Sequence, residues 1–204
     1  NIRRLGGYDT SGSAEGVQVV GNLAYVADGT NGLQVLDVSD PVNIRPLGGF
    51  VDTNGYAFSV QVAGDLAYMA DGTNGLLVLD VSDPASIRPL GGYGTYWAAE
   101  RLQMVDNLAY VADGPAGLQV LDVANPAQMR LLGSFATSAS ALNVQVVGGL
   151  AYVGDANGGL QMLNVSDPSD ICQLGTIDTK RPGASVHVVG NLVIVANGEA
   201  GWTL

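Results

Sequence analysis

The stretch LAYVADGTNGLQVLDVSDP, residues 23–41, returns as LAYMADGTNGLLVLDVSDP at residues 66–84. The two windows of 19 residues differ at only two positions, Val26/Met69 and Gln34/Leu77. Repetition at a fixed period predicts an architecture built from stacked copies of one supersecondary unit. Over the 204 residues the units start at Asn1, Asn43, Ser86, Gln128 and Asp170, with spacings of 42, 43, 42 and 42, and the fifth unit stops early.

Each unit contains short runs with the period and β-branched content of strands. In the first unit these runs cover residues 17–20, 23–27 and 33–38, and turn residues such as Gly-Asn and Ser-Asp-Pro separate them. A fourth run at 44–50 contains Pro46, which has no N–H to give to a neighbouring strand, so this run belongs at a sheet edge. No segment has a convincing helical period, and the chain is therefore predicted to be all-β.

The repeat length and the strand content together predict a β-propeller. Four antiparallel strands about every 42 residues is the spacing of one propeller blade. We therefore expect one domain over residues 1–204, a five-bladed β-propeller of four-stranded antiparallel blades. The first unit opens with an edge-type strand at residues 2–8, whereas the last unit lacks its edge strand. The N-terminal strand is expected to complete the last blade and to close the ring.

The repeated stretch resembles the unit of the LVIVD-repeat family, which reads approximately G-N-x-A-Y-V-A-D-G-x-x-G-L-x-I-x-D-V-S-x-P. Residues 21–41 follow this pattern and all five units match it in part, so the resemblance spans the chain. The fifth unit departs most, with Ile194, Asn197 and Trp202 in place of Tyr, Asp and Leu. The resemblance implies a propeller fold found in bacterial and archaeal, often exported, proteins, and so favours an extracytoplasmic or secreted location. It implies no defined reaction.

The composition limits the kinds of partner. The chain has 19 acidic residues against 8 Lys and Arg, a net charge of −11, which disfavours nucleic acid because phosphates need clustered basic residues. No apolar run approaches the roughly 18 residues of a transmembrane helix, so no membrane insertion by this segment is expected. The single cysteine, Cys172, excludes an internal disulfide. It stands where the other units carry an edge-strand arginine, and a partly exposed thiol is predicted.

Most of the acidic residues recur at turn positions and are predicted to be structural, because an aspartate at a turn hydrogen-bonds nearby backbone. Calcium is the weaker interpretation. The loop at 28–32 lacks the ligand spacing of a calcium loop, and the loop at 52–55 has only its first pair of ligands. No metal and no other cofactor is therefore expected. The recurring residues are Asp28, Asp71, Asp113 and Asp155; Asp37, Asp80 and Asp122; Asp40, Asp83 and Asp167; and Asp9, Asp52 and Asp178.

Propeller topology places the loops between blades on one face, together with the turns that join the second and third strands. We call this the loop face. The loops between blades differ most among the units, and function usually sits on variable loops over a rigid scaffold. Aromatic residues beside a few charges suit sugar stacking or a small anionic ligand; alternatively, Phe58 and Trp97 only plug the tunnel mouth. The candidate ligand-binding residues are Tyr56, Phe58, Tyr96, Trp97, Glu100, Arg101, Lys180 and Arg181.

The innermost strands carry a second repeated feature, expected near the propeller axis. Four units have a glutamine at one position, and the fifth has His187, the only histidine. Such side chains are expected to line a narrow, wet tunnel in which water bridges the amides. His187 breaks the symmetry and is added to the candidate ligand-binding residues. The glutamines are Gln18, Gln61, Gln103 and Gln145.

These features favour a non-enzymatic interaction module that recognises an unknown protein partner, or a small or carbohydrate ligand, through its loop face. The first alternative is a carbohydrate-active or other small-molecule enzyme at the same face, for which Glu15 and Glu100 are the candidate paired carboxylates. Ser185 shares a strand face with His187, but no third partner for nucleophilic catalysis is evident from the sequence. The second alternative is a structural spacer or an assembly subunit.

Overall fold

The computed structural model describes residues 2–52, 54–156, 159–179, 185–196 and 202–203. In this part of the chain the predicted all-β class is confirmed, because one short 3-10 helix, η1 (Pro126–Gln128), is the sole helical element beside 19 strands. The strands form five separate antiparallel sheets in chain order, four of them with four strands and the last with three. Each of the first four sheets takes three strands from one unit of the sequence and its fourth strand from the start of the next unit, as expected for propeller-like blades.

In every sheet, consecutive strands lie side by side, so each sheet is a simple meander. The first contains β1 (Gly16–Val20), β2 (Leu23–Ala27), β3 (Leu33–Asp37) and β4 (Arg45–Phe50). The second contains β5 (Ser59–Ala63), β6 (Leu66–Ala70), β7 (Leu76–Asp80) and β8 (Arg88–Tyr93). The third contains β9 (Arg101–Val105), β10 (Leu108–Ala112), β11 (Leu118–Asp122) and β12 (Arg130–Phe135). The fourth contains β13 (Ala141–Val147), β14 (Leu150–Asp155), β15 (Gly159–Asn164) and β16 (Cys172–Ile177), and the fifth β17 (Ser185–Val189), β18 (Leu192–Ala196) and β19 (Trp202–Thr203).

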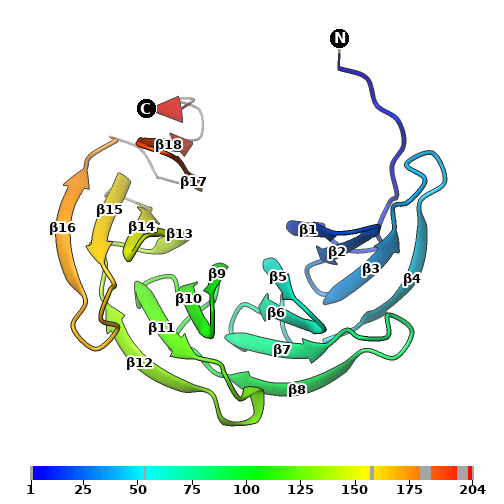
Figure 1. The fold of residues 1–204 in the computed structure, drawn as a ribbon, viewed down its shortest axis with the longest axis horizontal. Coiled ribbons are helices and arrows are strands. Elements are labelled where there is room, and N and C mark those ends of the chain that lie inside the picture. The colour runs from blue at the N-terminus through cyan, green and yellow to red at the C-terminus, as the bar shows by residue number, and fades with distance from the viewer. Residues whose placement is uncertain (1, 53, 157–158, 180–184, 197–201, 204) are drawn as a thin grey trace.

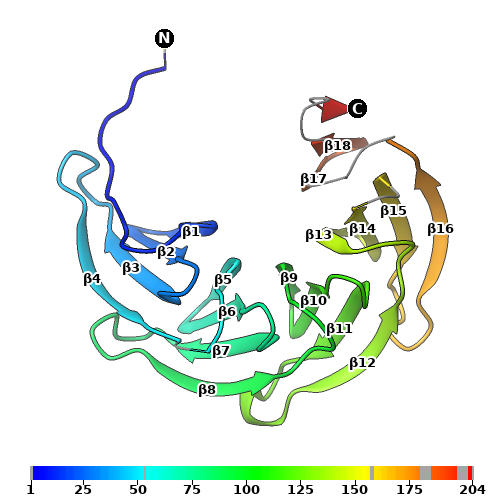
Figure 2. The same cartoon turned by 180° about the vertical axis from the view of Figure 1, so that it is seen from behind.

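The five sheets fan out along an arc (Figure 1). The first strand of each sheet lies on the inside of the arc, and β4, β8, β12 and β16 form its outer rim. The view from behind shows the same arrangement, with the first and fifth sheets on the two sides of an opening (Figure 2). The N-terminal segment starts near this opening and runs down to the first sheet.

A two-residue turn joins the first two strands of each sheet, and its conformation explains the glycines of the repeat. Gly21 and Gly64 have φ values of 60° and 59°, in the left-handed region that residues with a Cβ rarely adopt. In the third sheet Asp106 takes the same conformation, with φ 52°. Aspartate tolerates it better than most residues because its short side chain bonds locally.

Apolar side chains between neighbouring sheets form the core. Each sheet uses both faces, since alternate residues of its strands point to the sheet before it and to the sheet after it. Each fully buried aliphatic or aromatic side chain contributes about 1.5–3 kcal/mol. Between the first two sheets the buried residues are Tyr25, Ala27, Leu33 and Val35 from one sheet and Ala57, Val60, Ala67, Met69, Leu79 and Val81 from the other. Clusters with equivalent positions lie between the second and third sheets and between the third and fourth.

A close contact at the outer rim explains why β4, β8 and β12 carry a glycine at the same position. Gly48 lies so close to the carbonyl oxygen of Pro84, in the following sheet, that a methyl group there would overlap it. Gly91 and Gly133 approach Pro126 and Pro168 in the same way. At these three positions the proline-containing turn of one sheet therefore packs directly against the rim strand of the sheet before it.

The predicted closing strand is not seen. Residues 2–8 form no strand, the fifth sheet has three strands, and no sheet joins the two ends of the chain. In Figure 1 the N-terminal segment runs alone from the side of the opening down to the first sheet, whereas β19, the strand that it was expected to pair with, lies across the opening. Four of the five sheets have the expected four strands.

The rim contact predicts a sharp difference between two adjacent glycines of β8. Gly91→Ala should lower the free energy of unfolding by about 1–3 kcal/mol, because the new methyl group must displace the backbone of Pro126. Gly92→Ala is the matched control, since its methyl group would have its nearest neighbour, the carbonyl oxygen of Leu76, at 3.5 Å. Urea unfolding of both variants measures the difference, and equal midpoints would contradict the packing described here.

Candidate functional site

The segments that join one sheet to the next form the loop face, and the first three of them are fastened to the sheet before them. The N–H of Ala57 donates to the carbonyl oxygen of Gly29 at 3.0 Å, and the N–H of Gly29 donates back to Ala57 at 3.2 Å. The same backbone bridge joins Gly72 to Ala99. The connecting segments therefore end at fixed points where the next sheet begins.

A buried aspartate in each of the first four sheets holds the connecting segment. Asp113 is fully buried and accepts the N–H groups of Tyr96, at 3.0 Å, and Trp97, at 3.2 Å. It also accepts the side-chain amide of Gln119 at 2.6 Å. A carboxylate can be buried when its oxygens accept several hydrogen bonds. These aspartates, predicted to be structural, thus bind a neighbouring segment of the chain as well as their own turn.

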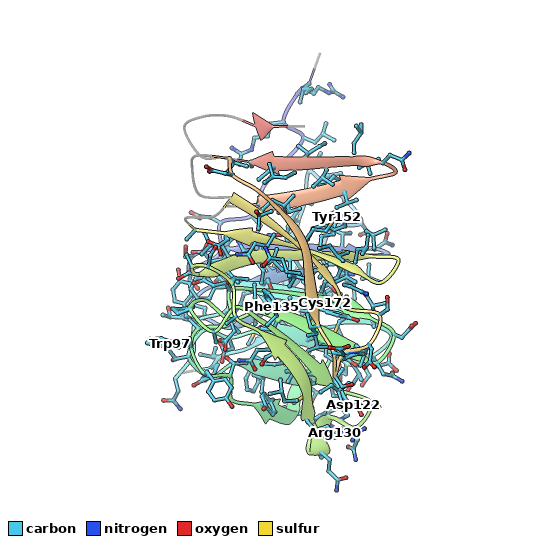
Figure 3. The ribbon with its side chains drawn as sticks, turned by 90° about the vertical axis from the view of Figure 1, so that its left-hand side faces the viewer. Trp97, Asp122, Arg130, Phe135, Tyr152 and Cys172 are labelled. Atoms are coloured by element: carbon cyan, nitrogen blue, oxygen red, sulfur yellow. The ribbon has the colours of Figure 1, made fainter. Side chains whose placement is uncertain are left out.

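The aromatic side chains of the segment that joins the second and third sheets point into solvent. Tyr96 is 75% exposed and Trp97 is 58% exposed, although their backbones are held by Asp113. In Figure 3, Trp97 projects from one side of the ribbon. This exposure is inconsistent with the alternative in which Trp97 plugs the tunnel mouth, whereas Phe58 is half-buried against Tyr56, with ring centroids 4.6 Å apart.

Arg101, a candidate ligand-binding residue, joins three sheets. Its Nη1 donates to the carbonyl oxygen of Phe58 in the second sheet at 2.8 Å, and also to that of Glu100 at 3.0 Å. Its Nη2 reaches the carbonyl oxygen of Glu15, beside the first sheet, at 3.4 Å. A planar guanidinium suits this role because its donors are fixed in a fork. The geometry therefore assigns Arg101 to the scaffold, a role that the sequence did not reveal.

Two glutamates near Arg101 differ in proton affinity. The hydroxyl of Tyr56 donates to Glu15 at 2.7 Å, and this bond, with one from Ser13, lowers the pKa of Glu15. Burial raises the pKa of Glu100, with Arg101 acting in the opposite direction. The structure thus brings together four of the candidate residues, Tyr56, Phe58, Glu100 and Arg101, with Glu15, the second of the candidate paired carboxylates.

The family model for the LVIVD repeat matches residues 11–49, 54–95, 98–137 and 138–179. The chain belongs to the LVIVD-repeat family. The resemblance read from the sequence is thereby confirmed over the first four units. No curated protein matches the chain.

Solved structures show the same kind of fold. The LVIVD chain is similar to the computationally designed Ika8 protein, with 12% identity and a TM-score of 0.75 over 91% of this chain and 56% of that one. It therefore spans just over half the length of that protein. The computationally designed Ika4 protein matches with 12% identity and a TM-score of 0.65, over 81% of this chain and 99% of that one. At such low identity, the likeness concerns the fold alone.

The glutamines of the LVIVD units bind backbone, a role the sequence did not suggest. The Oε1 atom of Gln18 accepts the N–H of Val62 at 2.6 Å, and Nε2 donates to the carbonyl oxygen of the same residue at 3.3 Å. Val62 belongs to the next sheet, so the amide joins two neighbouring inner strands. Gln103 and Val146 form the same pair of bonds, at 2.6 and 3.0 Å. The amides expected to be bridged by water in a tunnel are thus satisfied directly by protein.

The rim arginines of the LVIVD units pair with aspartates of the third strands. Arg130 donates to Asp122 at 2.8 Å (Figure 3). An equivalent pair lies within the first sheet and another within the second sheet. In the fourth sheet Cys172 stands opposite Asn164, so the arginine and its carboxylate have changed together. The predicted exposure of Cys172 is confirmed.

Three further candidates belong to the fifth unit. His187 is exposed on β17, and Lys180 and Arg181 fall outside the described residues. Among the residues described, no group of three or more His, Cys, Asp or Glu side chains is placed to hold a metal ion. In the same part of the chain, no helix is both long and apolar enough to cross a membrane.

One buried aspartate of the LVIVD scaffold faces a second carboxyl group. Asp71 is fully buried beside Asp52, and the side-chain amide of Asn74 donates to both, at 3.0 and 3.3 Å. Burial, and then the contact with Asp52, raises the pKa of Asp71 to about 7. The hydrogen bond with Asp71 lowers the pKa of Asp52. Like charges this close do not both ionise readily, so the pair retains one proton near neutral pH.

This pair predicts a pH-dependent effect of Asp71→Asn. Because folding raises the pKa of Asp71, the native state is favoured while the group is protonated, and that stability is lost as the pH rises from about 4 through 7. The amide mimics the protonated acid at every pH. From pH 4.5 to 8 the free energy of unfolding of the variant should therefore rise relative to the wild type by roughly 1–3 kcal/mol.

Urea unfolding at a series of pH values measures this difference. Asp65→Asn is the matched control, because Asp65 is exposed and its substitution should leave the pH profile unchanged. A constant difference between Asp71→Asn and the wild type over this range would show that Asp71 is ionised throughout.

Proposed function

We propose that this LVIVD-repeat chain is a non-enzymatic interaction module that recognises a protein partner through its loop face. One observation carries the proposal: the backbone N–H groups of Tyr96 and Trp97 are bound by the buried Asp113, while both side chains remain exposed. Two large aromatic groups are thus presented to solvent from a fixed backbone.

Such an arrangement favours binding for two physical reasons. Aromatic side chains dominate the energetics of protein interfaces, because each buries a large apolar area with few rotatable bonds. A loop that is already ordered loses little conformational entropy when a partner binds. The connecting segments are also the parts in which the units differ most. The segment between the second and third sheets can therefore provide a contact that the others do not.

Trp97→Ala tests this function. The variant should lose at least tenfold in affinity for the partner, the scale of an interface hot spot. Its unfolding midpoint should stay close to that of the wild type, because the indole ring is largely exposed. Val42→Ala is the matched control, since Val42 is 70% exposed in the turn between β3 and β4, at the opposite end of the first sheet.

The measurement is affinity capture with the wild type and both variants, followed by titration of each captured protein and of a glycan panel. A partner retained by the wild type and by Val42→Ala, but lost by Trp97→Ala, supports the proposal. Partners that bind all three equally would overturn it, and binding confined to glycans would replace the protein partner with a carbohydrate ligand.

We also propose that the five sheets are the blades of one ring, a single domain over residues 1–204, and that residues 2–8 are the outer strand of the fifth blade. The support is the way the N-terminal segment lies on the first sheet. Gly6 packs against the carbonyl oxygen of Pro41 as Gly48 packs against Pro84. Residues 2–8 thus occupy, on the first sheet, the place that each rim strand occupies on the sheet after it.

The connection that follows this segment is also of the repeated kind. Thr10 donates to the buried Asp28 at 2.5 Å, and the N–H of Gly12 donates to it at 3.1 Å. These bonds match those that hold the other connecting segments. The open face of the first sheet exposes Val17 by 64%, whereas the equivalent Val60 of the second sheet is 5% exposed.

Superposing the units gives the register of the proposed pairing. Gln34 pairs with Gly49 in the first sheet, and the equivalent residues are Thr203 and Gly7. In a Cys172→Ser background, the pair Gly7→Cys and Thr203→Cys should form a disulfide within one chain, because paired strands bring Cα atoms within the range that a disulfide spans. Leu5→Cys with Thr203→Cys is the control out of register. Absence of the bond in the first pair, or its equal formation in the control, would refute this closure.

A further inference from the structure

The hydrogen bonds along the inside of the arc repeat with one polarity. Four times, a backbone N–H of one inner strand donates to the Oε1 atom of a glutamine in the strand before it, each time at 2.6 Å. The donors are Val62, Met104, Val146 and Val188, and the acceptors are Gln18, Gln61, Gln103 and Gln145. We call these the axial bonds.

The part shared by all four axial bonds is an acceptor. The return bond, from Nε2 to a backbone carbonyl oxygen, has a length of 3.3 Å at Val62 and 3.0 Å at Val146, longer than the 2.6 Å of the bonds to Oε1. A residue that replaces the glutamine must therefore offer, above all, an atom that accepts a hydrogen bond at the same reach.

The two ends of the series are unmatched in the described structure. His187 occupies the glutamine position of the fifth sheet, where it is exposed and stands opposite Ile194. Val19 follows Gln18 as Val62 follows Gln61, so it is the residue whose N–H a preceding sheet would bind. Val19 is 58% exposed, and no side chain among the residues described accepts its N–H.

We propose that His187 makes the fifth axial bond, in which an unprotonated imidazole nitrogen accepts the N–H of Val19 when the fifth blade meets the first. The inference rests on the proposed ring closure and adds to it the contact that joins the two ends at the axis. A neutral imidazole has one nitrogen that donates and one that accepts, so it can supply the acceptor that the glutamine amide supplies elsewhere. Its outer nitrogen lies about as far along the side chain as Oε1 of glutamine.

Histidine makes this junction different from the other four. The ordinary pKa of histidine side chains lies in a range just below neutral pH, and protonation converts the accepting nitrogen of an imidazole into a second donor, which removes such a bond. The glutamine amide does not titrate. The axial bond at the closing junction should thus be present above this range and lost below it, whereas the four glutamine bonds persist.

The described elements packed around His187 carry few other titratable side chains. β17, β18 and β13 carry no other titratable side chain, and β14 carries Tyr152 and Asp155. Tyr152 packs in the apolar cluster with Leu160 and Val186, and Asp155 accepts the side-chain amide of Gln161 at 2.8 Å. On the first sheet, Glu15 precedes β1 and is bound by Tyr56. Lys180 and Arg181 precede β17, outside the described residues.

Amide hydrogen exchange of the full chain, followed by NMR, tests the proposal. In the wild type the protection factor of the Val19 amide should fall at least tenfold from pH 7.5 to pH 5.5. His187→Gln restores the residue of the other units and should keep Val19 protected at both values. His187→Ala should leave it unprotected at both. The reciprocal change, Gln145→His, should transfer the pH dependence to the amide of Val188.

The exchange of residues 2–8 separates the two proposals. If their amides are unprotected in the wild type at pH 7.5, ring closure is overturned, and the fifth axial bond with it. If those amides are protected and Val19 is equally protected in the wild type and in His187→Ala, the ring closes without His187, and the bond proposed here is overturned. A pH-dependent Val19 that becomes pH-independent in His187→Gln supports the assignment.

Discussion

Each sheet of this chain is apolar on both faces, and neither face is stable in water. A single four-stranded sheet cannot bury its own faces, so each copy depends on its neighbours, and the pattern of one unit determines the assembly of all of them. The cluster between the first two sheets shows this dependence, because Tyr25 and Leu33 of one sheet are buried in the same cluster as Met69 and Leu79 of the next. Apolar contact alone does not fix the orientation of one sheet on the next. The axial amide bonds and the rim contacts between glycine and proline join specific atoms and so define that orientation.

The variable connecting segments depend on this scaffold through buried carboxylates. Asp28 and Asp113 are fully buried, and each accepts hydrogen bonds from the segment that crosses its end of the sheet. These bonds go largely to backbone N–H groups, which every residue except proline possesses. The connecting segments can therefore change their side chains while keeping their path, and the segment between the second and third sheets can expose Tyr96 and Trp97 from a support of the same kind that holds Thr10 and Gly12 on the first sheet.

Much of the fold could be predicted from the sequence, because the signals involved are local. The period of about 42 residues, the turn glycines and the proline of the fourth run specify the strands, their order and the rim position of β4. The site was harder to predict. The partners of Arg101 are carbonyl oxygens, which carry no signature in the sequence. The axial glutamines were placed correctly, but the backbone of the next unit was not visible as their partner, since every residue offers the same N–H.

The axial bond has a consequence for how such chains change in length. Gln18 binds Val62, and the residue after Gln61 is Val62 itself, so each unit carries the acceptor for the unit ahead and the donor for the unit behind. A unit that is copied in tandem arrives with both halves of its joints already matched to its neighbours. Gene duplication can therefore lengthen or shorten the array without a compensating mutation at the axis, because this joint needs one glutamine from the unit behind and only a backbone N–H from the unit ahead.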